Sequence, residues 1–552
     1  MSFEAEGRKV GIMDSGFKLN EEDIMTAAIT FAALFAASVG VAETPSVRSE
    51  DGAKGLVAMS DEAFARLESR FEKRVAAILA TPNMSVPEGA ERRYISARTG
   101  DDAADGRTPA TAWRTAERLR GEALAPGAFV LFERGGIYRG SVSTRPGVTY
   151  TAYGEGRKPR IYVSPEDGAD PAKWERTEVE GIWRYKIGEY DVGTLVFDGG
   201  RAHAVKIVPV GHGDGTFTQQ FGGRPFNNGY ADLACDLHFW HDYSAKAKFQ
   251  PHAKGTGYLY LRSGENPGSR FKSIEFSIRR SGFSVGRNDG VTIDNMCVMY
   301  VGAHGIGAGT VKDLKVTNCE FGWIGGSIQA EGIFGRAWPT RFGNAVEIYG
   351  GCDGFTVERC YVHDVYDAGL THQYSITLSG GEKPVMQKNV RYADNAIERC
   401  NYSIEYFLSG VKGADRDPSR MENVVIENNY MRDAAVGFCR QRPDVTTGAH
   451  IKGWRGSLRN RASGFVVKGN VFAGSDEMFV EISSDLRNPD GSDSMPALSG
   501  NVFVGRRGQR FGVLNQGKPE ELKYDDELVR SLGTRYAGNI YAVRGDAAPS
   551  GR

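Results

Sequence analysis

A short apolar pattern that recurs through the second half of the chain constrains the fold more than any other feature. Each copy is a run in which an apolar residue stands three places before a Met, Cys or Asn, and we name this run strand B. The copies are VTIDNM (291–296), LKVTNC (314–319), FTVERC (355–360), NAIERC (395–400), VVIENN (424–429), FVVKGN (465–470) and ALSGN (497–501). Fixed strands separated by loops of variable length predict a solenoid, in which each coil stacks only on its neighbours.

A second set of short runs, which we name strand A, alternates with strand B. The apolar centres of strand A are Val285, Ile306, Val346, Leu370, Ile404, Phe438, Val480 and Val513. Stacked coils place equivalent residues about 4.8 Å apart, so these centres should lie in register in that order. Two ladders of like side chains are then expected, Cys319–Cys360–Cys400 and Asn429–Asn470–Asn501. We expect the three cysteines to be reduced and to face the interior as small apolar groups.

The composition agrees with a solenoid of short strands and argues against several other classes of protein. The 552 residues include 71 glycines and 11% aromatic residues, a mixture that suits many strands joined by tight turns. Charge is balanced, with 68 basic and 69 acidic residues, so no strong field would attract nucleic acid or an anionic membrane. The seven cysteines are an odd number in a long chain, which argues against a disulfide framework.

The N-terminal part of the chain carries an apolar stretch, MTAAITFAALFAASVGVAE, from Met25 to Glu43. Its length and its small-residue end resemble the core and cleavage site of a signal peptide. We expect residues 1–42 to be an over-extended start plus this signal-like segment, with Met25 as the true start and the mature protein periplasmic or secreted. A buried helix or a membrane anchor is the alternative interpretation.

Residues 55–91 are expected to form a helix followed by a linker. The stretch SDEAFARLESRFEKRVAAIL, from Ser60 to Leu79, is amphipathic, and Ser60 is a suitable N-cap. A second, shorter helix is expected at 111–119. Helix signals nearly vanish after that, so the rest of the chain is expected to be all-β.

From residue 92 onward the chain resembles the pectin-lyase-like family of right-handed parallel β-helix proteins, which includes secreted bacterial carbohydrate-active enzymes. Besides strands A and B, the resemblance depends on RRYISARTGDDAADGRTPATAWRTAERL (92–119) and GGIYRGSVSTRPGVTYTAYGEGRKPRIY (135–162). These motifs are specific for the fold and weak for the reaction. The resemblance implies a right-handed parallel β-helix over residues 92–545 under an N-terminal helical cap, with the helix 60–79 near its N-terminal end. It also implies a small β insertion at about 170–270 and a tail at 546–552.

The outward face of strand A is expected to carry acidic side chains. Strand residues alternate in direction, so the residue after each inward centre should point outward. This column reads Gly307, Glu347, Thr371, Glu405, Cys439, Glu481 and Leu514. The connections from strand A to strand B are long at 374–389, 409–423, 443–464 and 484–496. Long loops beside a rigid sheet predict a groove along strand A.

Paired carboxylates are the chemistry that glycoside hydrolysis requires, about 5–5.5 Å apart for retention and about 6.5–9.5 Å for inversion. We expect Asp367 and Glu405 to be the catalytic pair, with Glu347 close by and Asp364 as a further candidate. Carboxylates this close should raise at least one pKa, which suits a general acid. The alternative is that the carboxylates are solvated and the site lies elsewhere, and that Asp364 caps a turn.

Polar groups near the strand ends are the candidate substrate-binding residues. They are His363, His372, Gln373, Arg440, Gln441, Arg442 and Glu481. His372 and Arg440 have the inward parity, and burying them without partners would cost free energy. We therefore expect the strand to end or bulge there, turning both side chains toward the groove to bind sugar hydroxyls or a carboxylate.

An exported glycoside hydrolase that acts on a polysaccharide or oligosaccharide is the leading hypothesis, as a monomer with no cofactor, metal, nucleic acid or membrane partner. The second hypothesis is a polysaccharide lyase for uronic acids, with Arg440, Arg442 or His372 as the base and Ca²⁺ as a possible cofactor. The stretch NPDGSD (488–493) lacks the spacing of a calcium loop and indicates a polar turn. The third hypothesis is a non-catalytic glycan-binding or tailspike-like fibre.

Overall fold

The computed structural model describes residues 55–544 with gaps. The residues left out within that range are 221, 248–249, 251, 332–337, 376–383, 410–418, 443–446, 454–461, 485–490, 517–519 and 537. The signal-like stretch Met25–Glu43 and the tail 546–552 lie outside the described residues. Among the described residues, no helix is both long enough and apolar enough to cross a membrane.

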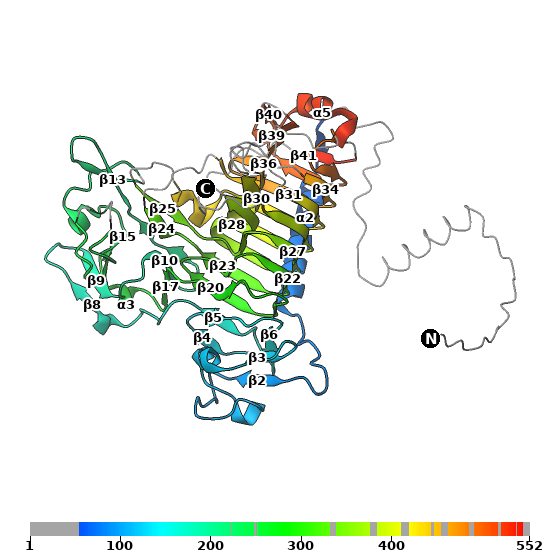
Figure 1. Cartoon of the computed structure of the whole chain (residues 1–552). Coiled ribbons are helices and arrows are strands. Elements are labelled where there is room, and N and C mark those ends of the chain that lie inside the picture. The colour runs from blue at the N-terminus through cyan, green and yellow to red at the C-terminus, as the bar shows by residue number, and fades with distance from the viewer. Residues whose placement is uncertain are drawn as a thin grey trace, which may run out of the picture. The chain divides into compact units, whose positions relative to one another are not determined.

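The strands wind into a right-handed parallel β-helix, as expected from the sequence, and a typical coil contributes to three sheets (Figure 1). Sheet B contains six of the seven strands that the B pattern predicts, together with β2, β3, β6 and β29, all in parallel pairs. Its order is β2 (Arg92–Ile95), β3 (Phe129–Glu133), β6 (Thr149–Tyr153), β19 (Thr292–Asp294), β22 (Val311–Thr317), β27 (Cys352–Glu358), β29 (Met386–Ala393), β31 (Arg420–Glu427), β34 (Ala462–Lys468) and β37 (Ala497–Ser499).

Sheet C follows sheet B along each coil. The sequence pattern predicts only strands A and B, so it does not distinguish the strands of sheet C. Its strands are β4 (Ile137–Arg139), β7 (Arg160–Tyr162), β20 (Cys297–Val301), β23 (Glu320–Ile324), the first parts of β28 (Tyr361–Ser375) and β30 (Ala396–Ser409), β32 (Tyr430–Ala434), β35 (Val471–Ser475), β38 (Val502–Gly505), β41 (Ile540–Arg544) and β1 (Val57–Met59).

Sheet A comes third and contains the strands expected to carry the site. They are β5 (Val142–Ser143), β18 (Phe283–Gly286), β21 (Ile306–Ala308), β26 (Val346–Tyr349), the second parts of β28 and β30, β33 (Ala449–Gly453), β36 (Met478–Ser484) and β39 (Arg510–Gln516). Strands β28 and β30 run from sheet C into sheet A without a break, so each of these two strands contains residues of both sheets.

The register of strand A confirms the centre of the predicted stack. Val346 pairs with Leu370, and Leu370 pairs with Ile404, on adjacent coils. Ile306 pairs with Val346 one coil earlier. Each of these side chains is fully buried in the main core. The outward column is therefore correctly aligned from Gly307 to Glu405.

Other predicted centres of strand A need correction. Phe438 lies in the 3-10 helix η7 (Gly437–Gln441), and Ile451 of β33 is the residue in register with Ile404. Strand β33 was missed because it lies inside a segment taken as one long connection. At the two ends of the stack, Phe283 rather than Val285 pairs with Ile306, and Gly512 rather than Val513 pairs with Val480.

The assignment of NAIERC to strand B is also wrong, because this run belongs to sheet C. The true B strand of that coil is β29, whose Tyr392 is in register with Val357 and Ile426. Cys400 accordingly pairs with Val365 in sheet C and does not continue a ladder with Cys319 and Cys360. All three cysteines are fully buried, as expected, and free.

An asparagine ladder forms the corner between sheets B and C. Its members are Asn395, Asn429, Asn470, Asn501 and Asn539. The side-chain oxygen of Asn429 accepts hydrogen bonds from the backbone N–H of Asn395 at 3.1 Å and from its side-chain amide at 2.9 Å. The same pair of bonds repeats at each later step. Buried turn amides are thereby satisfied by one residue per coil.

The helix α2 (Asp61–Leu79) begins after Ser60, whose hydroxyl caps it as predicted. It lies along sheet C, and just beyond its C-terminal end the carbonyl of Thr81 accepts hydrogen bonds from Arg134 and Asn295 of the first coils. Leu67 and Phe71 belong to one buried cluster with Tyr430 and with residues of later coils of sheet C. That sheet offers a long apolar strip that matches the apolar face of α2. Helical structure in the first coils consists of two short 3-10 helices, η1 (Pro109–Thr111) and η2 (Ala116–Gly121).

The predicted insertion forms a separate small sheet. Its order is β12 (Val205–Lys206), β15 (His238–His241), β16 (Tyr258–Arg262), β9 (Ile182–Lys186) and β8 (Trp174–Arg176). Strands β10 (Val192–Phe197), β11 (Ala202–His203) and β17 (Ile274–Ile278) join it to the β-helix, and β13 (Pro209–Gly211) pairs with β14 (Phe217–Gln219). The remaining elements are η3 (Pro171–Lys173), η4 (Gly229–Asp232), α3 (Pro267–Arg270), the hairpin β24 (Ser327–Glu331) and β25 (Pro339–Phe342), β40 (Glu521–Lys523), α5 (Asp526–Leu532) and η9 (Gly533–Tyr536).

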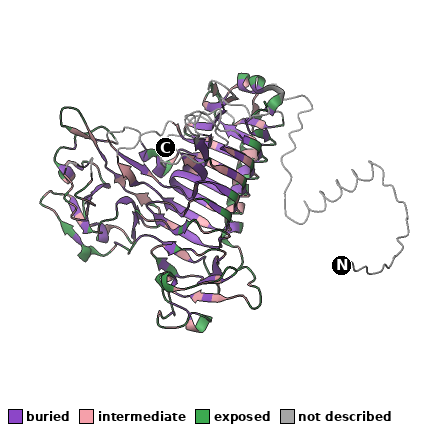
Figure 2. Ribbon diagram, viewed as in Figure 1, coloured by how far each residue is buried: buried purple, intermediate pink, exposed green. Residues whose placement is uncertain are grey.

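The core lies inside the stacked coils. In Figure 2 the stacked strands are mostly buried, whereas exposed residues concentrate in the loops and in the insertion. This leaves the outer faces of the sheets as the places where charged side chains can be displayed.

Candidate active site

A row of charged side chains lies on the outer face of sheet A. Glu347, Thr371, Glu405, Lys452 and Glu481 are register partners on five successive strands. Because adjacent strands are about 4.8 Å apart, Lys452 stands between Glu405 and Glu481. Together with Asp367 and Arg442, described next, these charged residues are named the charged row.

Lys452 occupies the place that the sequence analysis had given to Cys439. Cys439 is instead part of η7 and is fully buried. Leu514, expected at the end of the outward column, pairs with Ile482, and Val513 is the partner of Glu481. The run AHIKG (449–453) has the apolar centre followed by a charged residue, which is the signal that could have found Lys452.

Asp367 lies where β28 bends from sheet C into sheet A. The register with β30 shifts between Val365 and Ala368, so Asp367 sits in a β-bulge. A terminal nitrogen of Arg442 lies 2.7 Å from Asp367 Oδ1. Arg442 directly follows η7, so this helix and the bulge are joined by an ion pair.

Glu347 is held by polar side chains from three neighbouring segments. The side-chain amides of Asn344 and Gln373 donate to Glu347 Oε2, the second at 3.1 Å. His304 Nδ1 lies 3.2 Å from the same oxygen. The side-chain oxygen of Asn344 also accepts from the backbone N–H of Ala368 at 2.8 Å, so Asn344 connects Glu347 to the bulge. Asn344 and His304 were not anticipated from the sequence.

The carboxyl group of Glu405 differs electrostatically from its neighbours. Its pKa is raised to about 8, first by burial and then by the charge of Asp367, with a smaller contribution from Glu347. Lys452 and Arg442 act in the opposite direction. Glu405 and Asp367 are nearly inaccessible, with 7% and 5% of each residue exposed. Asp367 and Glu347 thus both act electrostatically on Glu405, and Glu405 is the group whose pKa is raised.

Lys452 is fixed by Glu481 of the row and by the ring of Tyr402. Its ammonium nitrogen lies 3.0 Å from Glu481 Oε2 and 4.8 Å from the centre of the Tyr402 ring. Burial alone would lower the pKa of Lys452, but Tyr402, Glu481 and Glu405 outweigh that effect and raise it. Lys452 is therefore a permanent cation beside Glu405 at neutral pH.

Asp364 and His363 lie in a different group of charges, which we name the sheet C network. Its members are His363, Asp364, Glu398, Arg399 and Arg432. Asp364 Oδ2 lies 2.8 Å from His363 Nδ1, and Arg399 binds both oxygens of Asp364 at 2.9 Å. Burial raises the pKa of Asp364, but His363 and Arg399 outweigh it and hold that pKa well below its usual range.

The structure places Asp364 and His363 in the sheet C network, apart from the charged row, and their catalytic and substrate-binding roles stay predictions. Asp364 has a left-handed backbone conformation with φ of 51° inside strand β28, and its carboxylate bonds the side chains of His363 and Arg399. The pKa of His363 is raised to about 9: burial lowers it, but its bonds to Asp364 and Glu320 outweigh that effect. Both side chains are committed to each other and to sheet C.

His372 is an interior residue, contrary to the expectation that it turns into the groove. Strand β28 continues to Ser375, so the inward parity of His372 is kept and the side chain is fully buried. Its Nδ1 lies 2.9 Å from the Tyr392 hydroxyl, and the ring stacks on Tyr406. Burial lowers the pKa of His372 to about 3, so it is neutral and packs as an aromatic side chain.

The remaining substrate-binding candidates divide into three cases. Gln373, Arg442 and Glu481 lie in or against the charged row, as described above. Gln441 is buried and bonds the insertion: it accepts from the backbone N–H of Lys206 at 3.1 Å and donates to the carbonyl of Ala204 at 3.0 Å. Arg440 has a side chain 42% exposed and pairs with Glu477 at 3.1 Å.

The surroundings of the row are only partly described. The long connections expected to wall a groove fall largely on 376–383, 410–418, 443–446, 454–461 and 485–490, which lie outside the described residues, as does part of NPDGSD. Within the described part, no group of three or more His, Cys, Asp or Glu side chains has an arrangement that could hold a metal ion.

The strand ladders and the charged row describe a right-handed parallel β-helix protein with a buried set of carboxylates on one face. No family model and no curated protein matches the chain. Among solved structures, the complex of XylC with xylose is 12% identical with a TM-score of 0.43, covering 79% of this chain and 72% of that one.

Two further solved structures are similar to the chain at low identity. A GH136 lacto-N-biosidase from Eubacterium ramulus is 14% identical with a TM-score of 0.33, covering 83% of this chain and 69% of that chain. A polygalacturonase from Erwinia carotovora ssp. carotovora is 9% identical with a TM-score of 0.27, covering 79% and 96%. These similarities carry no argument about the reaction, which has to be argued from the residues.

Proposed function

We propose that the protein is a glycoside hydrolase that cleaves a polysaccharide or oligosaccharide, with Glu405 as the general acid. The observation that carries this proposal is the raised pKa of Glu405, about 8, in a buried set of carboxylates. A carboxyl group that stays protonated at neutral pH can donate its proton to the oxygen of a leaving sugar. Without that shift, Glu405 would be ionised and unable to do so.

Asp367 is the second carboxylate in this proposal. It forms an ion pair with Arg442 at 2.7 Å, and as the carboxylate it would either attack the anomeric carbon or activate water. Two neighbouring carboxyl groups with opposite protonation states are the arrangement that glycoside hydrolysis requires. Glu347, fixed by Asn344 and Gln373, is assigned a supporting role as an acceptor for a sugar hydroxyl.

The geometry supports a hydrolase over a lyase. A lyase needs a base that removes the proton next to a uronate carboxyl group. His372 is buried in the core, Arg442 is engaged by Asp367, and Lys452 has a raised pKa beside Glu481. A non-catalytic fibre would have no use for a carboxyl group held protonated beside a charged one.

Product analysis on a panel of neutral and uronate glycans tests the proposal. We expect new reducing ends without absorbance in the enone band, and loss of this activity in Glu405→Gln. Products that absorb in the enone band would assign the protein to the lyases. Binding without cleavage by any preparation, combined with unchanged binding in Glu405→Gln, would favour the fibre.

Export is proposed as well, and it is supported by the signal-like stretch Met25–Glu43. A fusion of residues 1–60 to a reporter that needs disulfides to fold should be active only outside the cytoplasm. Deletion of residues 25–43 should abolish the reporter activity. Equal activity of both fusions would contradict export through this segment.

A further inference from the structure

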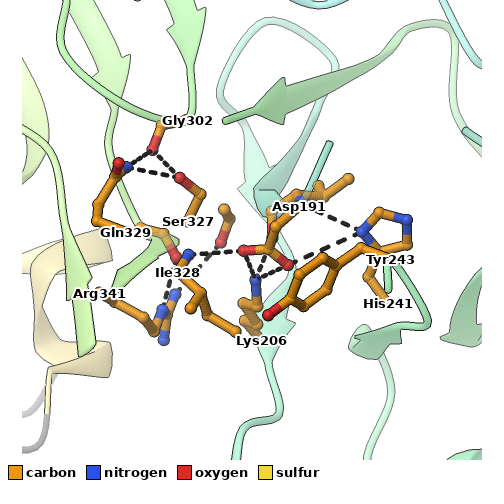
Figure 3. Close-up of polar contacts among 12 residues, drawn as sticks. Asp191, Lys206, His241, Tyr243, Gly302, Ser327, Ile328, Gln329 and Arg341 are labelled. Atoms are coloured by element: carbon orange, nitrogen blue, oxygen red, sulfur yellow. Dashed lines mark hydrogen bonds and ion pairs between the residues drawn. The ribbon is translucent and has the colours of Figure 1, made fainter. Parts of the chain in front are cut away.

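The insertion is joined to the β-helix around a fully buried ion pair (Figure 3). Lys206, at the end of β12, donates to Asp191 Oδ1 at 2.6 Å and to the carbonyl of Val192 at 2.6 Å. Asp191 precedes β10 and also lies 3.8 Å from His241 Nδ1. The side chains of Lys206 and Asp191 are 1% and 0% exposed. Neither residue belongs to the charged row.

One arm leads from this ion pair to Asp367 through the hairpin β24–β25. Asp191 Oδ2 accepts from the backbone N–H of Ile328 at 2.6 Å. Ile328 pairs with Arg341 across the hairpin, and the guanidinium of Arg341 lies 4.5 Å from the centre of the Tyr366 ring. Tyr366 is fully buried and directly precedes Asp367 in the bulge.

A second arm reaches the same carboxylate through η7. The backbone N–H of Lys206 donates to Gln441, and Gln441 returns a bond to Ala204, so the end of η7 is fixed on the insertion. The next residue is Arg442, which forms the ion pair with Asp367 and lies 5.5 Å from the Tyr366 ring centre. The two arms therefore converge on the dipeptide 366–367.

A buried ion pair is an expensive way to hold two segments together. Burial lowers the pKa of Lys206 to about 8 although Asp191 acts against this, which reflects the free-energy cost of removing both charges from water. Apolar side chains of similar volume often stabilise a protein as well as such a pair. An ion pair with fixed hydrogen bonds also sets the direction and the distance between the two segments. Here the two arms that start from this ion pair end at Asp367.

We propose that the insertion is part of the catalytic machinery, with Asp191 and Lys206 as positioning residues that hold Asp367 against Glu405. The proposal rests on the proposed function for the chemical role of Asp367 and Glu405. The placement of Asp367 itself is independent of that role. The insertion thus acts through the bulge and through Arg442, without contacting the substrate.

The test measures the pKa of Glu405 directly, so that it does not depend on activity. The protein is labelled with ¹³C at glutamate carboxyl carbons, the Glu405 signal is assigned by its loss in Glu405→Gln, and its titration is followed by NMR. In Gln441→Met we expect the buried ion pair to stay intact. The end of η7 then loses its hydrogen bonds to the insertion, and Arg442 should move away from the charged row. Because Arg442 lowers the pKa of Glu405, we expect that pKa to rise by about half a unit or more.

Lys206→Met is the second variant and should disturb both arms. We expect kcat to fall roughly tenfold to a hundredfold, because small displacements of catalytic groups are costly. If Lys206→Met fails to fold, Gln441→Met decides the question by itself. Arg432→Met in the sheet C network is the matched control, since it removes a partly buried ion pair away from both arms and should leave the Glu405 titration unchanged.

The outcomes separate this proposal from the proposed function. A Glu405 pKa within about 0.2 units of the parent value in a folded Gln441→Met, with kcat within about twofold, would overturn the positioning role. Full activity of Glu405→Gln would overturn the proposed function. In that case the NMR titration of the Gln441 variant would still report whether the insertion positions the row.

Discussion

Two faces of the same β-helix gather buried charges, and they use them in opposite ways. In the sheet C network, Asp364 and Glu398 are each bonded by arginine, and the pKa of each is lowered although burial alone would raise it. In the charged row on sheet A, the pKa of Glu405 is raised to about 8. Both groups contain several carboxylates, and both are shielded from solvent.

The difference shows that the number of buried carboxylates does not identify a catalytic site. On sheet C the charges are balanced and serve packing: Arg432 bonds Glu398 and reaches Glu68 and Glu72 of α2. On sheet A the cations leave one acid insufficiently compensated. Holding the Glu405 carboxyl group away from its ordinary protonation state gives no structural benefit. A strongly shifted pKa of this kind therefore makes Glu405 a candidate functional group.

The same substitution on each face should have opposite consequences, and this is the largest expected effect. Glu405→Gln keeps the shape but removes the transferable proton, so kcat should fall by roughly 10²–10⁴-fold with little change in the thermal midpoint. Glu398→Gln removes a charge that Arg432 and Arg399 bond, so it should cost about 2 kcal/mol of stability and leave kcat nearly unchanged. Steady-state kinetics and thermal unfolding measure both variants.

Asp367→Asn should resemble Glu405→Gln in kinetics. If both amide variants of the charged row keep near-parental activity on a substrate that the parent cleaves, the catalytic site lies elsewhere. The region of Arg440 and Glu477 would then be the next to examine.

Arg432→Met should destabilise the protein without slowing catalysis. Its guanidinium bonds Glu398 and two glutamates of α2 and lies 3.8 Å from the centre of the Phe71 ring. Removing it should lower the free energy of unfolding by roughly 2–3 kcal/mol, measured by denaturant titration. A loss of kcat larger than the loss of folded protein would mean that the two faces are coupled.

The pH dependence of kcat/KM should show the raised pKa of Glu405. Activity requires the protonated acid, so it should decline as the pH rises through about 8. Lys452 lowers the pKa of Glu405. Lys452→Met should therefore shift the alkaline decline of kcat/KM to higher pH by about one pH unit. Lys452→Arg keeps the charge and is the control. A downward shift in Lys452→Met would contradict the assignment of Glu405 as the acid.

Arg440→Ala should have the smallest effect. Its side chain is 42% exposed and its ion pair with Glu477 is near the surface, so the variant should lose less than about 1 kcal/mol of stability. If Arg440 binds substrate, KM should increase several-fold with little change in kcat. Unchanged KM would remove Arg440 from the binding residues.

Local pattern was sufficient to predict the stacked centres Val346, Leu370 and Ile404, because apolar alternation and coil spacing determine them. Sheet C was missed because NAIERC satisfies the same pattern: Ile397 stands three places before Cys400, as Tyr392 stands before Asn395. The pattern is local, and only the pairing with neighbouring coils separates the two.

The errors in the site have similar causes. Lys452 was missed because a short strand inside a long connection has little signal of its own. Strand alternation predicts the inward direction of His372 correctly. It does not predict that the Tyr392 hydroxyl, from another sheet of the core, offers His372 a hydrogen-bond partner and so reduces the cost of burial. The position of α2 depends on residues more than 300 positions away, such as Asn395, whose carbonyl accepts from Arg74.

The asparagine ladder has a consequence for how such a chain can change in length during evolution. Each ladder residue must meet the amide of the next coil, so an added residue at that corner would leave buried polar groups unbonded, at about 1–3 kcal/mol each. Where the chain leaves sheet A, lengthening a loop costs little, about 0.6 kcal/mol for each doubling. Insertions should therefore be tolerated in the loops beside the charged row and should destabilise the protein at the corner between sheets B and C. A lineage can thus vary the loops beside the charged row while every coil, and with it the geometry of that row, is inherited unchanged.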